Sequence, residues 1–284
     1  MSGFDASWLA LREPVDHRSR SETLTAALEA WLASRVPDTR RLVDLGCGAG
    51  SNVRYLVPRL EGRQHWTCVD DDAALLEDVA RIRFAGVALE ARRLDLARDL
   101  ATIPHADDAA PHVLTGAALL DLVSDAWIEA MVALARRCRA AVLFALTVDG
   151  RLEASPAHAE DDGIREAFAA HQHRDKGFGP ALGPDAPSKA AAALGAAGYV
   201  IQRATSDWRL DARVPGDAAL LEPLLEGIAA AAIEQVPSAK ARIVEWLEAR
   251  RRQCADGTLR FVVGHEDTLG LPSEDADELR DVDA

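Results

Sequence analysis

The chain has 284 residues, a formal net charge of −14 and a sequence pI of about 5.0. This length builds one sizeable core with helical additions but hardly two independent enzymes, so we expect a single domain over residues 1–284. The acidic balance argues against nucleic acid or an anionic membrane as a partner, and it favours a small or neutral substrate.

The sequence shows no leader and no apolar segment long enough to span a membrane, so we expect a cytoplasmic protein. Alanine and arginine are abundant and lysine is scarce, which is typical of a high-GC bacterial genome. The four cysteines have neither paired nor metal-like spacing and are expected to be reduced. No cluster of His, Asp and Glu repeats with ligand spacing, so no metal is expected.

Residues 1–37 are expected to form an N-terminal cap. The segment 8–18 mixes aromatic, basic and acidic side chains too richly for a plain linker. Residues 22–34 place apolar side chains at helical spacing after a serine-rich cap region, and Pro37 is expected to end this helix.

Residues 38–148 are expected to form a cofactor-binding core, which opens with a strand, a glycine-rich turn and a helix. The apolar residues Leu42, Val43 and Leu45 are typical of a parallel strand covered on both faces. Gly46, Gly48 and Gly50 strip side chains from the turn, so a ligand can lie against the backbone. Ser51 and Asn52 are able to cap the helix that follows. The pattern predicts a seat for a nucleoside cofactor.

Two known phosphate-binding patterns are missing at this turn. The dinucleotide fingerprint requires a third glycine at position 51, where this chain has Ser51, so an NAD(P)-linked oxidoreductase is poorly supported. The triphosphate-binding loop, which ends in Gly-Lys-Ser or Gly-Lys-Thr, is absent from the sequence.

Acids follow the next two expected strands. Residues 65–69 end at Asp70 and Asp71, where a carboxylate can accept both ribose hydroxyls and where several acids would repel a phosphate. Residues 88–94 end at Asp95 and Leu96, where a side chain can accept from an adenine amino group and a backbone N–H can meet the ring.

The chain departs from a minimal alternation of strands and helices after residue 148. Residues 149–187 form a polar insertion with an expected helix at 159–171, and insertions of this length are usually lids or binding loops. Residues 188–265 return to the core and contain a helical insertion at 216–254. Residues 266–284 form an acidic tail that we expect to be disordered. The expected strands after the third are 112–116, 140–148, 199–208 and 259–263.

The turn and the two acidic strand ends resemble the class I S-adenosylmethionine-dependent methyltransferases, over residues 40–146 and 188–263. The resemblance implies that Asp44, with the three glycines, wraps the methionine end of the cofactor. It implies that Asp70 binds the ribose and that Asp95 with Leu96 binds the adenine. Gly116 and Ala117 match family positions that touch the cofactor.

The resemblance also implies a fold and an activity. The fold is an α/β, mostly parallel, doubly wound sheet of seven strands, with an antiparallel last strand, helices on both faces and helical caps. The activity is transfer of a methyl group from S-adenosyl-L-methionine to O, N or C of a small molecule, with S-adenosyl-L-homocysteine as product. A cation without phosphate suits an acidic cleft.

Two acid–base candidates follow from the same sequence. Asp121 falls where small-molecule methyltransferases often have a pocket residue, and it is able to orient or deprotonate an acceptor; it is equally well a helix-start cap or an exposed acid. His171 and His173, with Asp175, offer a base and its orienting partner on the insertion; the alternative is a solvated helix end.

Four further residues are candidates for binding. Arg12 is suited to a two-pronged contact with the cofactor carboxylate, or else pairs with Glu13 or Asp16. Trp8 and Phe178 are expected to line an aromatic pocket, with His17 as a weaker candidate for the substrate site.

Two methyltransferase subclasses lack support. Residues 115–118 read Thr-Gly-Ala-Ala where enzymes that methylate amino groups of bases or glutamine carry Asn/Asp-Pro-Pro-aromatic. The Pro-Cys nucleophile of cytosine-C5 enzymes is also missing. We therefore expect a small-molecule acceptor and a monomer or homodimer. A protein or RNA methyltransferase and a non-catalytic cofactor-binding module stay as alternatives.

Overall fold

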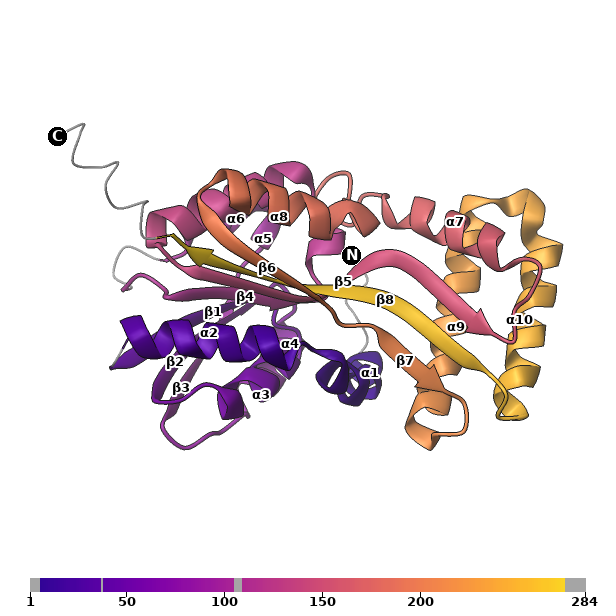
Figure 1. Ribbon diagram of the computed structural model, residues 1–284, viewed down its shortest axis with the longest axis horizontal. Helices are drawn as coiled ribbons and strands as arrows, with labels where there is room; N and C mark the ends of the chain where they lie inside the picture. Colours follow the sequence, from indigo (N-terminus) through magenta and orange to yellow (C-terminus); the bar gives the residue numbers. More distant parts are fainter. Residues whose placement is uncertain (1–5, 37, 105–108, 274–284) are drawn as a thin grey trace.

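The computed structural model describes residues 6–36, 38–104 and 109–273 and contains one eight-stranded sheet (Figure 1). The strand order is β3-β2-β1-β4-β5-β8-β6, and β7 pairs with β8 beside this path. The strands are β1 (Thr39–Leu45), β2 (Arg63–Asp70), β3 (Val87–Arg93), β4 (Val113–Ala117), β5 (Ala141–Ser155), β6 (Tyr199–Thr205), β7 (Trp208–Asp211) and β8 (Arg260–Pro272).

Strand directions confirm the predicted fold class. Strands β1 to β5 pair in parallel, whereas β8 runs antiparallel to β5, β6 and β7. The sheet has eight strands where seven were expected, because the expected strand 199–208 ends at Thr205 and a further short strand, β7, begins at Trp208. Strands β6 and β7 pair with different stretches of the long strand β8.

The C-terminal boundary also differs from the prediction. The expected strand 259–263 is only the start of β8, which continues to Pro272. Residues 266–272, assigned to an acidic tail, pair with both β5 and β6. Their acids have specific uses: Asp267 is 2% exposed and accepts from the backbone N–H groups of Leu146 and Ser21, at 2.8 Å each. The rest of the predicted tail, 274–284, lies outside the described residues.

Helices cover both faces of the parallel part of the sheet. One face is packed by α2 (Glu22–Arg35), α3 (Ser51–Leu56) and α4 (Ala73–Val79), and the other by α5 (Leu96–Asp99), α6 (Asp125–Cys138) and α8 (Ala186–Ala196). Figure 1 shows these two layers on opposite sides of the strands. A doubly wound sheet of this kind leaves the carboxyl ends of its strands free for ligands.

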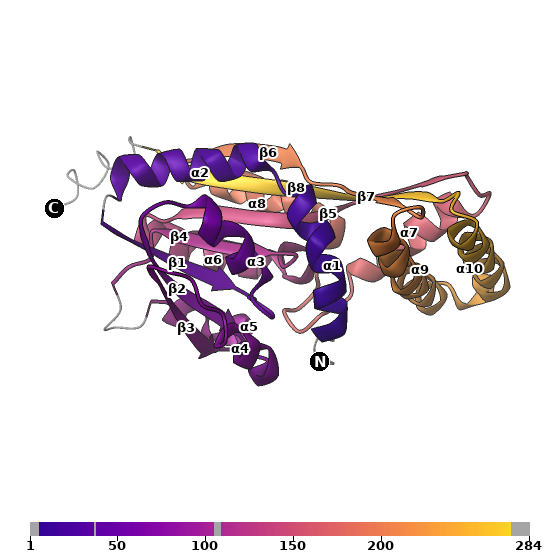
Figure 2. The ribbon, with the colours of Figure 1, turned by 90° about the horizontal axis from the view of Figure 1, so that it is seen from below.

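A second apolar cluster lies beyond the parallel strands. Strand β5 extends to Ser155, so residues 149–155 of the expected insertion belong to the sheet. This end of the sheet packs with α1 (Ala6–Ser19), α7 (Asp161–Gln172), α9 (Pro215–Gln235) and α10 (Lys240–Ala255). Figure 2 shows α7, α9 and α10 grouped at this end, with α1 between them and the parallel strands.

Buried polar contacts fasten the helices of this second cluster. Arg250 on α10 is fully buried and donates to the carbonyl of Pro156 at 2.7 Å and to Asp161. Trp246 Nε1 donates to the same Asp161 at 2.8 Å. The first residue of α7 is therefore joined to α10 by two side chains. No described helix combines the length and the apolar character needed to cross a membrane.

Candidate functional site

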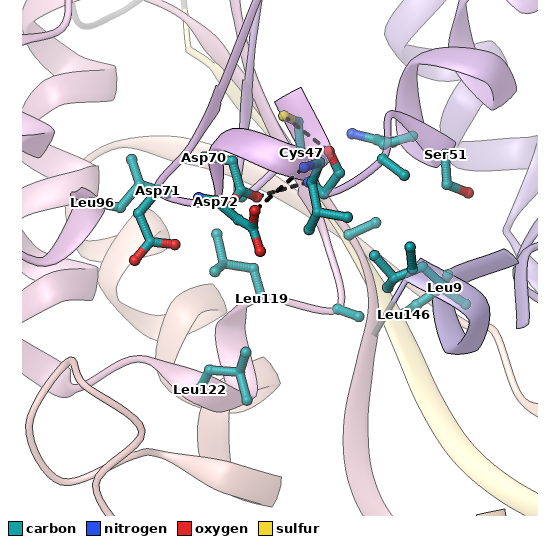
Figure 3. A pocket seen from close by; sticks show the side chains of 18 of the residues that line it. Leu9, Cys47, Ser51, Asp70, Asp71, Asp72, Leu96, Leu119, Leu122 and Leu146 are labelled. Carbon is teal, nitrogen blue, oxygen red and sulfur yellow. Dashed lines mark hydrogen bonds between the residues drawn. The ribbon is translucent and has the colours of Figure 1, made fainter. Parts of the chain in front are cut away.

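A cavity of about 1100 Å³ opens at the carboxyl ends of the parallel strands. Its walls come from the glycine turn after β1, the ends of β2 and β3, the loop after β4, helix α1 and residues 175–178. The three strand ends singled out from the sequence therefore meet at one cavity. In Figure 3, Asp70, Asp71 and Asp72 lie beside Leu96 and below Cys47 of the turn.

The glycine turn needs backbone conformations that other residues rarely adopt. Gly46, Gly48 and Gly50 have φ of 66°, 52° and 84°. Gly46 and Gly48 line the cavity, and a Cβ at Gly48 would meet only Leu9, at 3.4 Å. Gly50 is not among the lining residues, and a Cβ there would lie 2.5 Å from Ile82 Cδ1. Its contact with the cofactor stays a prediction.

Asp44 lies beneath the turn and does not line the cavity. It is fully buried, and its Oδ1 accepts from Asn52 Nδ2 at 2.7 Å. Within the described part of the chain its Oδ2 has no hydrogen-bond partner, and burial raises the pKa of this carboxyl to about 7. Asp44 therefore joins the end of β1 to α3 through Asn52, and its contact with the methionine end stays a prediction.

Replacing Asp44 with asparagine is expected to flatten the pH dependence of stability. Because the folded-state pKa lies above the unfolded value, stability from the neutral carboxyl is full below pH 4 and is lost as the pH rises through 7. We compare the free energy of unfolding of Asp44→Asn with that of wild type at each pH. The difference in favour of the variant should be about 2–3 kcal/mol larger at pH 8 than at pH 5. Urea unfolding of both proteins at the two pH values measures this difference, and parallel profiles would contradict it.

The start of α3 also differs from the prediction. Its N-cap is Gly50 in the left-handed conformation, and no described side chain caps it. Ser51 and Asn52 are instead used in contacts across the site. Ser51 O and Oγ both lie 3.1 Å from His17 Nε2, while Asn52 bonds to Asp44 and Arg20.

Asp70 links the end of β2 to the glycine turn. Its Oδ2 accepts from Gly48 N–H at 2.8 Å, and its Oδ1 accepts from Asp72 N–H at 3.0 Å. Burial raises the pKa of this carboxyl. Asp70 and Asp71 both line the cavity, and Asp72, which the sequence did not single out as a binding residue, lines it while capping α4.

Asp95 and Leu96 line the cavity at the end of β3, as the sequence implied. Asp95 also caps the short helix α5 by accepting from Ala97 N–H at 3.0 Å. Leu96 is 5% exposed, so its backbone is held in the core beside the cavity.

Arg12 lines the cavity, but its side chain already has a partner. Its Nε and Nη2 donate to Asp16 Oδ2 and Oδ1 at 2.8 and 3.1 Å. Asp16 is buried and also accepts from Trp208 Nε1 at 3.0 Å. The ion pair with Asp16, the alternative to a cofactor contact, is therefore the arrangement observed.

Arg20, which the sequence reasoning missed, is the better placed guanidinium. It lines the cavity and is 5% exposed, and its Nη1 donates to Asn52 Oδ1 at 2.5 Å. Its Nε and Nη2 have no hydrogen-bond partner anywhere in the described chain. Buried donors of this kind are costly unless a ligand satisfies them. Nothing in the local sequence marks Arg20, because its burial depends on contacts with α3.

His17 also lines the cavity, next to the turn. Its ring meets Tyr55 edge to face at 5.4 Å, and burial lowers the pKa of the imidazole, which favours the neutral form. Neighbouring Glu13 accepts from Arg54 Nε at 2.6 Å. These contacts join α1 to α3 and hold α1 over the turn.

Two of the predicted aromatic and small residues line the cavity and two do not. Phe178 lines it and packs edge to face on Trp127 at 6.2 Å, and Ala117 lines it at the end of β4. Trp8 instead packs against the second apolar cluster. Gly116 lies within the sheet, where a Cβ would be 2.9 Å from Leu45 O, so its glycine is explained by packing.

The predicted acid–base residues do not converge on the cavity. His171 pairs with Glu234 on α9 at 3.1 Å, and His173 Nδ1 lies 3.3 Å from the carbonyl of Ala181. Asp175 lines the cavity but accepts from two backbone N–H groups of its own loop. The His–Asp pairing is therefore not formed, since each group has another partner.

Asp121 is not among the lining residues, although the adjacent Leu122 is. Burial raises the pKa of its carboxyl to about 6, and charges on Arg12 and Lys176 oppose the shift. Its Oδ1 is buried and has no partner among the residues described. The alternative to a catalytic role for Asp121 was an exposed acid or a helix-start cap. Asp121 is not exposed, and the residue that caps α6 is Ser124.

No protein-family model matches this chain, and no curated protein matches it either. Similar solved structures include the cyclopropane synthase MmaA2 from Mycobacterium tuberculosis, with 12% identity, coverage of 94% of each chain and a TM-score of 0.49. A SAM-dependent methyltransferase from Geobacter sulfurreducens with bound S-adenosyl-L-homocysteine shows 14% identity, coverage of 95% and 99%, and a TM-score of 0.45. At these values neither likeness carries a substrate or a residue role over to this chain.

Proposed function

We propose that this chain is a class I S-adenosyl-L-methionine-dependent methyltransferase that acts on a small molecule. The observation that carries the proposal is the meeting of the open glycine turn, the acidic ends of β2 and β3, and the unpartnered donors of Arg20 at one cavity. The open backbone at Gly48 and the buried guanidinium both fit the cofactor's amino-acid end.

Each part of the cofactor has a matching group in the cavity. We assign the ribose to Asp70 and Asp71, the adenine to Asp95 and Leu96, and the carboxylate to Arg20 in place of Arg12. Carboxylates crowd the ends of β2 and β3, which disfavours a phosphate and suits a cation. This charge pattern supports an adenosyl sulfonium over a dinucleotide.

When bound, the cofactor supplies an activated methyl group on a sulfonium. The work left to the protein is to hold the acceptor in line with this group and to exclude water. Helix α1 and residues 175–178 wall the cavity for this purpose. His17 is our candidate proton acceptor for a protic nucleophile, because it lines the cavity and burial favours its neutral form. We do not propose His171 or His173 as the proton acceptor, because neither lines the cavity. Asp121 does not line the cavity either, so we assign it no contact with the acceptor.

The acceptor atom, whether O, N or C, is not assigned. A cavity walled in part by leucines from α1 and two loops supports a small acceptor over a protein or RNA chain. Cytoplasmic residence, a bacterial source and a monomeric or homodimeric state stay predictions from composition.

Calorimetric titration with S-adenosyl-L-homocysteine tests the proposed function directly. We expect saturable binding with a Kd in the micromolar range, roughly −8 kcal/mol, because sugar, base and carboxylate each find a polar partner. NADH and ATP, which carry phosphates, serve as controls and should bind far more weakly. Absence of binding at millimolar concentration by folded protein would exclude the proposal.

A further inference from the structure

Several leucines line the cavity in addition to the acidic strand ends. In Figure 3, Leu119 and Leu122 lie on one side of it and Leu9 and Leu146 on the other. Leu119 packs over Gly46 and Leu9 over Gly48, so the two leucines flank the turn. With Phe178, these side chains offer an acceptor site that is mainly hydrocarbon.

Most basic residues around the cavity are already occupied or exposed. Arg12 pairs with Asp16, and Arg54 pairs with Glu13. Arg93 is exposed and donates to the carbonyl of Asp71 at 2.9 Å. Among the arginines and lysines that line the cavity, Arg20, Arg93 and Lys176 have no carboxylate within ion-pair distance in the described ranges. Of these three, only Arg20 and Lys176 are not exposed.

Lys176 is carried by an ordered loop. Asp175 Oδ1 accepts from the N–H groups of Gly177 and Gly179 at 2.7 and 3.1 Å, which closes the loop around Lys176. Phe178 anchors the loop on the aromatic ring of Trp127. The loop therefore places Lys176, a partly buried residue, among those that line the cavity.

The buried acid near Lys176 does not neutralise it by contact. Asp121 is close enough for the lysine charge to lower its pKa, but the two side chains form no ion pair. An ammonium at an apolar wall gains most from an anion that it can bind directly, since charge-assisted hydrogen bonds are stronger than neutral ones.

We propose that the acceptor is a small, mainly apolar molecule carrying one carboxylate-like anionic group, and that Lys176 binds this group. The inference rests on the proposed function, in which Arg20 is taken by the cofactor carboxylate and Lys176 is left for the acceptor. The apolar body of the acceptor lies among the leucines and Phe178, which places its anion at the loop of residues 175–178.

Two dyes with one ring system test the proposal. The fluorescence of 1-anilinonaphthalene-8-sulfonate reports an apolar anion, and N-phenyl-1-naphthylamine is the same skeleton without the sulfonate. Both are titrated with and without saturating S-adenosyl-L-homocysteine. We expect Lys176→Met to weaken binding of the sulfonate by about tenfold and to change binding of the neutral dye by less than about twofold. Lys176→Arg should restore the sulfonate affinity.

Lys189→Met is the matched control, because Lys189 is exposed, pairs with Asp125 and does not line the cavity. It should change neither dye. The proposal would be overturned by any of three results. These are equal effects of Lys176→Met and Lys189→Met, equal effects of Lys176→Met on the two dyes, or no saturable binding of the sulfonate dye. One outcome separates the two proposals. If S-adenosyl-L-homocysteine does not bind but Lys176→Met still weakens the sulfonate dye selectively, the proposed function is wrong and the anion site at Lys176 is supported.

Discussion

Replacing Asp70 with alanine is expected to weaken binding of S-adenosyl-L-homocysteine by roughly 5- to 150-fold, or about 1–3 kcal/mol. Two losses add up in this variant. The ribose loses the carboxylate that is proposed to accept its hydroxyls, and Gly48 N–H loses the acceptor that now holds it at 2.8 Å. Calorimetry on wild type and Asp70→Ala measures the change.

Asp70→Asn and Glu77→Gln separate binding from folding. Asparagine keeps an acceptor oxygen for Gly48 but lacks the charge, so it should fall between wild type and Asp70→Ala. Glu77 lies on α4 with its side chain 72% exposed, and its neutralisation should leave affinity within about twofold. Unchanged affinity in a folded Asp70→Ala variant would show that the ribose is placed wrongly.

Arg20→Met is expected to weaken S-adenosyl-L-homocysteine by about 10- to 150-fold while leaving 5′-methylthioadenosine unchanged. The second ligand has the same adenosine and sulfur but no carboxylate. Because two of the guanidinium donors of Arg20 are buried without a partner, a carboxylate gains a charge-assisted contact there. Competition calorimetry with the two ligands isolates the effect of the amino-acid end.

Arg12→Met tests the competing assignment in the same assay. Arg12 already donates twice to Asp16, so this variant should not discriminate between the two ligands, whatever it does to stability. Equal losses for both ligands in Arg20→Met would mean that Arg20 acts through folding alone. A selective loss in Arg12→Met would return the carboxylate to Arg12.

The parts of the site predicted from sequence are those set by short-range backbone chemistry. A buried apolar run followed by Gly46 and Gly48 predicts an open turn, because only glycine adopts its left-handed conformations easily. Asp70 and Asp95 were predictable because parallel neighbouring strands bring their carboxyl ends to one edge. These signals lie within a few residues of each strand end.

The sequence does not show which of several local roles a residue has. Asp44 and Gly116 were expected at the cofactor, but neither lines the cavity: Asp44 is fully buried, and a Cβ at Gly116 would meet Phe144. The acids at 266–272 read as a tail, yet their strand pairs on both sides within the sheet. Composition cannot reveal pairing with strands that lie far away in the sequence.

The sequence by itself determined the fold class, the turn and the acidic strand ends, because each depends on residues adjacent along the chain. Only the tertiary structure decided which cations are free for a ligand. Arg12 and Arg20 lie on the same N-terminal segment, but Asp16 occupies the first and burial against α3 leaves donors of the second unpaired. The tertiary structure likewise decided the position of His171, which pairs with Glu234 of α9 and does not line the cavity. Side-chain pairing is a property of neighbours in space, and these neighbours come from distant segments.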